Sequence, residues 1–225
     1  ASTLTGALTA TTGTSVIAVT GGTDDDTIIM AGTYTTADTI NGGAGTDILS
    51  LTSAMVAGVT VSQANVSNIE TITLSDASTA ATYTVSAWNG ATNLVLSTAS
   101  TAAITVNYAA GAAGISYGAV IGTGAQTLNS AGSATTDSLA LTIGTTAAGV
   151  LVTSATVTSG FETIDVLAQG GTGSLGAITM AATAASETIN VTGAVALTLG
   201  AVTADALNAS TLTGALSMVT GTVAA

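Results

Sequence analysis

The chain has 225 residues, twelve of them acidic and none of them lysine, arginine or histidine, so its formal net charge is −12. Cysteine and proline are also absent. These absences exclude disulfides, cysteine–histidine zinc sites, a Ser-His-Asp triad and the lysine of a phosphate-binding loop, and they leave no basic surface for nucleic acid.

The first residues can be compared with the start of a secretory signal peptide. Ala1 is not an initiator methionine, and no charged segment opens the chain. We therefore expect a processed product, a fragment, or a chain exported without an N-terminal signal. No stretch reaches the roughly 18 apolar residues of a transmembrane helix, so we predict no membrane-spanning segment. A chain without lysine or arginine resists trypsin-like proteases, which favours an extracellular location.

Residues 16–51 contain two turns rich in glycine and aspartate. Gly42–Ser50 reads G-G-x-G-x-D-x-U-x, where U is a large aliphatic residue, which is the nonapeptide of calcium-binding parallel β-rolls. Gly21–Ile29 is a degenerate earlier copy of the same pattern. The glycines permit a tight turn with positive φ, and the aspartate supplies the hard oxygen ligand that calcium prefers. We therefore predict a calcium-binding segment over residues 16–51.

The acidic residues are concentrated in this segment. Five of the twelve acids lie in it, namely Asp24, Asp25, Asp26, Asp38 and Asp47. The acidic turns are followed by aliphatic residues such as Ile28 and Ile48, as the starts of strands should be. The alternative is that Asp47 only caps a turn and binds no ion.

Residues 66–225 form a second region of Thr/Ala-rich strand repeats. Ile69–Leu74 alternates apolar and polar residues, which predicts a half-buried strand. Similar starts recur at spacings close to eleven or twelve residues up to Glu187 and every nine residues after it. They are Thr82, Asn93, Ala103, Gly114, Gln126, Asp137, Gly149, Glu162, Ser174, Glu187, Ala196, Asp205 and Gly214.

Short strands at this spacing fit either a β-solenoid or β-sandwich domains in tandem. The solenoid is favoured because an acid or amide often stands just before a strand, the side chains are small, and long loops are lacking. We therefore predict an all-β chain in which residues 1–225 form a single elongated parallel β-solenoid. Helices are not expected, because β-branched residues are frequent and glycine is spread throughout.

Three glutamates and one tryptophan each have two possible roles. Glu70, Glu162 and Glu187 all precede Thr-Ile, and they are either further metal ligands or turn residues that accept backbone N–H bonds. We favour the second role. Trp88, beside Asn89-Gly90, is either a platform for a sugar ring or, as we favour, a packed corner of the fold.

The stretches at 38–51 (D-T-I-N-G-G-A-G-T-D-I-L-S-L) and 66–75 (V-S-N-I-E-T-I-T-L-S) resemble bacterial surface-layer proteins with RTX-type calcium-binding repeats. A looser copy of the second element lies at Gly160–Val166. The specific resemblance covers residues 20–80. It implies a right-handed β-solenoid (a β-helix or β-roll), export by a type I system and assembly into an extracellular sheet.

The resemblance also implies which residues bind calcium. In the intact nonapeptide the acid is Asp47, and the turn carbonyls belong to Gly43 and Gly45. In the degenerate copy the matching positions are Asp26, Gly22 and Asp24, where Asp24 replaces a glycine. The neighbouring Asp25 and Asp38 complete the set of candidate ligands.

We therefore expect an extracellular structural protein that self-assembles into a surface layer, sheath or filament. Its partners would be further copies of itself and cell-surface lipopolysaccharide or polysaccharide. The alternative is the stalk or a binding module of a large RTX adhesin. An enzyme is not expected. A carboxylate pair such as Glu162 and Asp165 could act as acid and base, but it has no lysine, arginine or histidine nearby to shift its pKa values.

Overall fold

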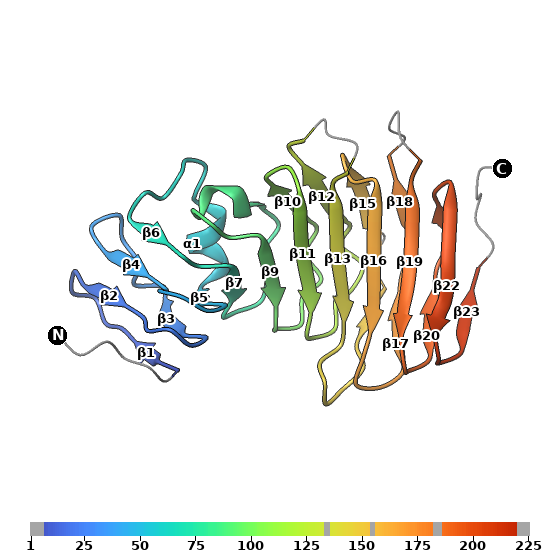
Figure 1. Ribbon diagram of the computed structural model, residues 1–225, viewed down its shortest axis with the longest axis horizontal. Helices are drawn as coiled ribbons and strands as arrows, with labels where there is room; N and C mark the ends of the chain where they lie inside the picture. The colour runs from blue at the N-terminus through green and yellow to red at the C-terminus, as the bar shows by residue number, and fades with distance from the viewer. Residues whose placement is uncertain (1–6, 133–135, 154–155, 182–185, 220–225) are drawn as a thin grey trace.

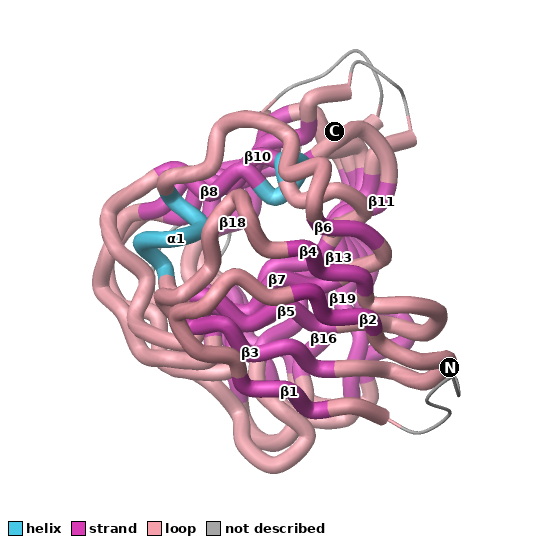
Figure 2. The backbone as a smooth tube through the Cα atoms, turned by 90° about the vertical axis from the view of Figure 1, so that its left-hand side faces the viewer, coloured by secondary structure: helices cyan, strands magenta, loops and turns pink. Residues whose placement is uncertain are grey.

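The computed structural model of the protein describes residues 7–132, 136–153, 156–181 and 186–219. The chain winds into a rod of stacked coils, in which the strands lie side by side across the long axis (Figure 1). Viewed along that axis, successive coils superimpose around a common interior (Figure 2).

One sheet runs the length of the rod and receives one strand from each coil. Its ten strands, in spatial order, are β1 (Thr9–Thr11), β3 (Thr27–Ala31), β5 (Ile48–Leu51), β7 (Thr71–Leu74), β9 (Asn93–Leu96), β11 (Ala112–Tyr117), β13 (Ser138–Ile143), β16 (Thr163–Ala168), β19 (Thr188–Gly193) and β22 (Ala206–Leu212). Strands of other sheets, or an irregular connection, separate these strands along the chain, as expected of a solenoid.

Three shorter sheets form the remaining faces. The three-stranded sheet contains β2 (Ala18–Thr20), β4 (Thr39–Asn41) and β6 (Val66–Ser67). The six-stranded sheet contains β8 (Thr82–Thr84), β10 (Ile104–Tyr108), β12 (Gln126–Ser130), β15 (Thr156–Ser159), β18 (Ile178–Met180) and β21 (Val202–Thr203). The four-stranded sheet contains β14 (Leu151–Val152), β17 (Gly173–Leu175), β20 (Leu197–Leu199) and β23 (Leu216–Met218).

The predicted β-solenoid is confirmed, and the alternative of tandem β-sandwiches is wrong. Every pair of strands between described residues is parallel, whereas sandwiches are built from antiparallel sheets. The coils differ in length. Thr9 pairs with Thr27, 18 residues later, and Gly114 pairs with Ala140, 26 residues later.

The strand predictions need two corrections. Each start predicted beyond residue 66 lies in or next to a strand, but β15, β18 and β21 were not predicted. They are a third strand in the coils that run from β13 to β16, from β16 to β19 and from β19 to β22. Helices were not expected, yet Ser53–Ala57 forms a short helix, α1, and Val85–Ala87 forms a 3-10 turn. The helix formers Ala54, Met55 and Ala57 favour this helical turn between β5 and β6.

The core is a set of ladders in which equivalent side chains stack along the rod. The longest lies inside the ten-stranded sheet, where every member is at most 1% exposed. In register it reads Ile28, Leu49, Ile72, Leu94, Ile115, Leu141, Val166 and Val191. Because each side chain packs on the next coil, no coil can bury its apolar face alone. No helix among the described residues is long and apolar enough to cross a membrane.

Candidate metal site in the acidic turns

The two glycine–aspartate turns lie directly on one another in adjacent coils. The Ala44 N–H donates to the Gly22 carbonyl oxygen at 3.0 Å, and the Thr46 N–H donates to the Asp25 carboxylate at 2.7 Å. Gly43 and Gly45 have positive φ, at 108° and 126°. A β carbon at either position would also collide with the backbone of the turn below, at Gly22 or at Asp24. Glycine is therefore required at both positions, as the motif predicted.

Asp26 and Asp47 are the acids that close these turns, and both side chains are buried. The Asp26 carboxylate accepts the Leu8 N–H at 2.5 Å with one oxygen and the Gly22 N–H at 2.6 Å with the other. The Asp47 carboxylate accepts only the Asp26 N–H, at 2.7 Å through Oδ1. Asp47 Oδ2 is buried without a hydrogen-bond partner.

The unpartnered oxygen follows from the conformation of the intact turn. In the degenerate copy, the N–H of the second glycine bonds the aspartate. In the intact copy, the equivalent Gly43 N–H turns instead to the side chain of Asn41, at 3.1 Å. A buried carboxylate oxygen without a hydrogen-bond donor lowers the stability of the fold. A cation bound at Asp47 Oδ2 would therefore stabilise the protein most.

The electrostatics of Asp47 agree with this reading. Burial raises the pKa of Asp47, the hydrogen bond from the Asp26 N–H opposes that rise, and the negative charges of Glu70, Asp26 and Asp25 add to it. Asp24 and Asp25 are exposed beside these turns, where an open hollow is lined by Ala7, Thr23 and the same two acids. A cation at this end of the rod would therefore meet several negative charges.

Carboxylates alone do not form a complete site here. Within residues 7–132, 136–153, 156–181 and 186–219, no three histidine, cysteine, aspartate or glutamate side chains converge as a group able to hold a metal ion. Calcium takes six to eight oxygens and accepts backbone carbonyls and water. An ion at Asp47 would therefore depend on the turn carbonyls for much of its coordination.

Asp38 belongs to a different face of the rod from the other candidate ligands. It precedes β4 in the three-stranded sheet, and its Oδ1 accepts the Ile17 N–H at 2.9 Å. Its Oδ2 accepts the N–H and the hydroxyl of Thr35, at 2.7 and 3.0 Å. The Ile17 N–H lowers the pKa of Asp38 most, burial opposes the shift, and both Thr35 bonds reinforce it.

The hydrogen bond from one coil to the carboxylate of the next recurs along the rod. Each acid stands immediately before a strand of the ten-stranded sheet and accepts the N–H of the matching residue one coil back. The further bonds are Asp47 N–H to Glu70 (2.8 Å), Gly111 N–H to Asp137 (2.8 Å), Asp137 N–H to Glu162 (2.8 Å) and Glu187 N–H to Asp205 (3.0 Å). We call this set, with Asp26 and Asp47, the carboxylate ladder.

The ladder confirms that Glu70 and Glu162 accept backbone N–H bonds, as we favoured. Glu187 is buried at the equivalent position. Asp137 and Asp205 were predicted only as strand starts, and the structure adds that they accept backbone N–H bonds in the same way. The described structure thus gives ladder roles to Asp26 and Asp47 as well, and among the described ladder acids only Asp47 has a buried oxygen without a hydrogen-bond partner.

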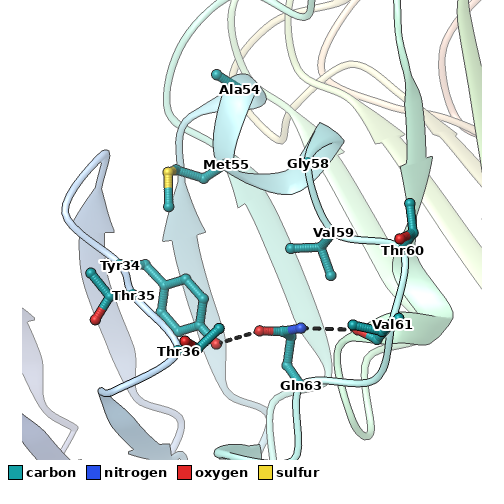
Figure 3. A pocket seen from close by; sticks show the side chains of 10 residues that line it. All are labelled: Tyr34, Thr35, Thr36, Ala54, Met55, Gly58, Val59, Thr60, Val61 and Gln63. Atoms are coloured by element: carbon teal, nitrogen blue, oxygen red, sulfur yellow. Dashed lines mark hydrogen bonds between the residues drawn. The ribbon is translucent and has the colours of Figure 1, made fainter.

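A pocket lies beside α1, away from the acidic turns. The pocket has a volume of about 360 Å³ and is lined by Tyr34, Thr35, Thr36, Ala54, Met55, Gly58, Val59, Thr60, Val61 and Gln63 (Figure 3). The Tyr34 hydroxyl donates to Gln63 at 2.8 Å, and the Gln63 amide donates to the Val61 carbonyl at 2.9 Å. These two polar side chains are thus already hydrogen-bonded within the protein.

Trp88 is a packed corner and not an exposed sugar platform. Its side chain is fully buried, and its ring centroid lies 5.2 Å from that of Tyr34.

Comparisons of the chain with protein-family models, curated proteins and solved structures find no match.

Replacing Asp137 by alanine tests the carboxylate ladder. The change would leave the Gly111 N–H without its acceptor and would remove the 2.6 Å bond from the Ser130 hydroxyl. We expect the free energy of unfolding in urea to fall by about 1–3 kcal/mol. The matched control is Asp165→Ala, at an exposed carboxylate, which should change stability by less than about 0.5 kcal/mol. Equal losses would contradict a structural role for the ladder.

Asp38 and Asp47 should have opposite effects on the pH dependence of stability, measured by thermal denaturation in chelator. The pKa of Asp38 lies below the ordinary 3.8, so its stabilisation is present at neutral pH and is lost as pH falls through the lowered value. The pKa of Asp47 lies above 3.8, so its contribution is present below 3.8 and is lost as pH rises through the raised value.

The comparison needs only two variants and the wild type. Relative to the wild type, Asp38→Asn should be least stable at neutral pH, with the deficit shrinking in acid. The stability of Asp47→Asn relative to the wild type should be highest at neutral pH and should fall in acid. Slopes of the same sign for both variants would show that the two carboxyl groups do not have opposite pKa shifts.

Proposed function

We propose that this chain is an extracellular structural protein that self-assembles into a surface layer, sheath or filament and binds calcium in its glycine–aspartate turns. The observation that carries the calcium part is the pair of stacked turns at Gly22–Asp26 and Gly43–Asp47, with Asp47 Oδ2 buried and unpartnered. Calcium supplies the positive charge that the amino-acid composition lacks.

Self-assembly is supported by the ends of the rod. Among the described residues, β1 and β22 are the outermost strands of the ten-stranded sheet, and each has one unpaired edge. Leu207 in β22 is only half-buried, whereas its partner Ile189 in β19 is fully buried. Unpaired edges and partly exposed core positions favour the addition of a further strand. We therefore assign the contact between copies to the ends of the rod.

One side of the rod, the six-stranded sheet, has an outward row that is rich in threonine. Thr82, Thr105, Thr127, Val157, Thr179 and Thr203 pair in register across the six-stranded sheet, so threonine occupies five of six positions in this row. The row has hydroxyl groups and no carboxylate, although the chain carries twelve acids. Such a face suits hydrogen bonding to the polysaccharide or lipopolysaccharide of a cell surface, which we propose as the second partner.

Calcium binding is tested by thermal denaturation with calcium, with magnesium and with chelator. An ion at 100 times its dissociation constant adds about 2.7 kcal/mol to the stability of the folded state. We expect calcium to raise the melting temperature of the wild type by several degrees, and Asp47→Asn to abolish that rise. Asp38→Asn is the matched control and should keep it, because the Asp38 carboxylate is already saturated with donors. A calcium shift of equal size in Asp47→Asn would remove Asp47 from the site.

Assembly is tested by negative-stain electron microscopy in millimolar calcium and after chelation. We expect ordered sheets or filaments in calcium. Asn208→Lys places a charge on the end strand β22 and should disperse them. Thr179→Lys makes the same change on β18, inside the six-stranded sheet, and should leave them intact. Dispersed monomers of the wild type in every condition would contradict self-assembly and favour the adhesin stalk. Assemblies that survive chelation would show that calcium is not needed for the contact between copies.

A further inference from the structure

The interior of the solenoid becomes polar about halfway along the six-stranded sheet. One inward ladder of that sheet reads Ile104, Gln126, Thr156, Ile178 and Val202. Gln126 and Thr156 interrupt an otherwise aliphatic row, and neither has any solvent exposure. The Tyr117 side chain, which comes from β11 in the ten-stranded sheet, is also fully buried. Three polar side chains therefore share an apolar interior.

These side chains carry polar atoms without protein partners. Gln126 Oε1, the Thr156 hydroxyl and the Tyr117 hydroxyl are all buried and make no hydrogen bond to another protein group. The same holds for Thr158, which is two residues beyond Thr156 on the same strand. Four of the six such atoms among the described residues thus belong to one region of the rod. Leaving them unsatisfied would cost stability at every one.

The orientation of the Gln126 amide is determined by its surroundings. Its Nε2 donates to the carbonyl oxygens of Gly124, at 2.8 Å, and Ala102, at 3.2 Å. Rotating the amide by half a turn would place Oε1 against two carbonyl oxygens. Nε2 therefore stays on these carbonyls, and Oε1 needs a donor from inside the solenoid.

The three groups are neighbours. Gln126 and Thr156 are direct partners on adjacent strands, which lie about 4.8 Å apart. The Thr156 hydroxyl lies close enough to the Tyr117 hydroxyl to oppose the rise that burial causes in the pKa of Tyr117. The two hydroxyls do not meet in a direct hydrogen bond of good geometry. Thr156 is also smaller than Gln126 and Ile178, its neighbours in the ladder, which leaves space beside its hydroxyl.

We propose that an ordered water molecule is bound inside the solenoid between β11, β12 and β15. It donates a hydrogen bond to Gln126 Oε1, accepts one from the Tyr117 hydroxyl and makes a third with the Thr156 hydroxyl. Buried waters typically make about three such bonds to otherwise unsatisfied groups. This inference is independent of calcium binding and of self-assembly, since all three residues lie away from the acidic turns and the ends of the rod.

The direct test is a crystal structure of the wild-type chain at a resolution that orders internal waters. We expect density for one water within hydrogen-bonding distance of all three side chains. A direct Tyr117–Thr156 hydrogen bond with no water between them, or a dry space, would overturn the proposal.

Thermal denaturation supplies a second test. Thr156→Val keeps the shape of the side chain and removes one partner of the water, so we expect the melting temperature to fall by about 2–4 °C. The control is Thr179→Val, the same change at an exposed site on the adjacent strand β18, which should have little effect. If Thr156→Val fails to fold, Tyr117→Phe removes another partner and should show the same loss. A melting temperature that stays equal or rises in both core variants would mean that the hydroxyls are dry and unbonded.

Discussion

The structure depends on a hydrogen bond between a backbone N–H and a buried carboxylate one coil further along. The chain has no basic side chain to pair with an acid, yet Asp26, Asp47 and Asp137 are buried at 1% exposure. A buried charge is tolerated only when its lone pairs find donors. The backbone supplies them at the point where each coil meets the ten-stranded sheet. The same hydrogen bonds therefore compensate the buried charges, align the strands and hold adjacent coils together.

The carboxylate ladder also explains why one of its members differs from the others. Most of the acids act between coils. Asp47 differs because its second oxygen is buried without a partner. In its turn, where Gly43 has positive φ, the Gly43 N–H bonds Asn41 and not Asp47. The conformation that defines the intact nonapeptide is thus associated with an unpartnered oxygen on its aspartate. The proposed calcium site and the stacking of coils are two uses of the same carboxylate.

The proposed water site in the interior follows the same physical rule with neutral groups. Gln126 and Thr156 interrupt an aliphatic ladder, and their oxygens must be satisfied or must cost stability. In the acidic turns, the proposed partner is a cation from solution. At Gln126 and Thr156, it is a trapped water. Both proposals come from asking where each buried polar atom finds its partner.

The sequence by itself determined the local features of this protein. Apolar alternation identified nearly all the strands of the ten-stranded sheet, glycine spacing identified Gly43 and Gly45 as turn residues, and acids before strands were recognised at Glu70, Glu162 and Glu187. These features are set by residues within a few positions of one another. Only the tertiary structure decided the spacing of paired residues along the ten-stranded sheet, which ranges from 18 residues at Thr9–Thr27 to 26 at Gly114–Ala140, and the additional strands β15, β18 and β21. It alone also showed that Asp38 lies on another face and that Asp47 retains a free oxygen. The physical reason is that each carboxylate bonds a backbone group a whole coil away, at a separation that local alternation does not encode.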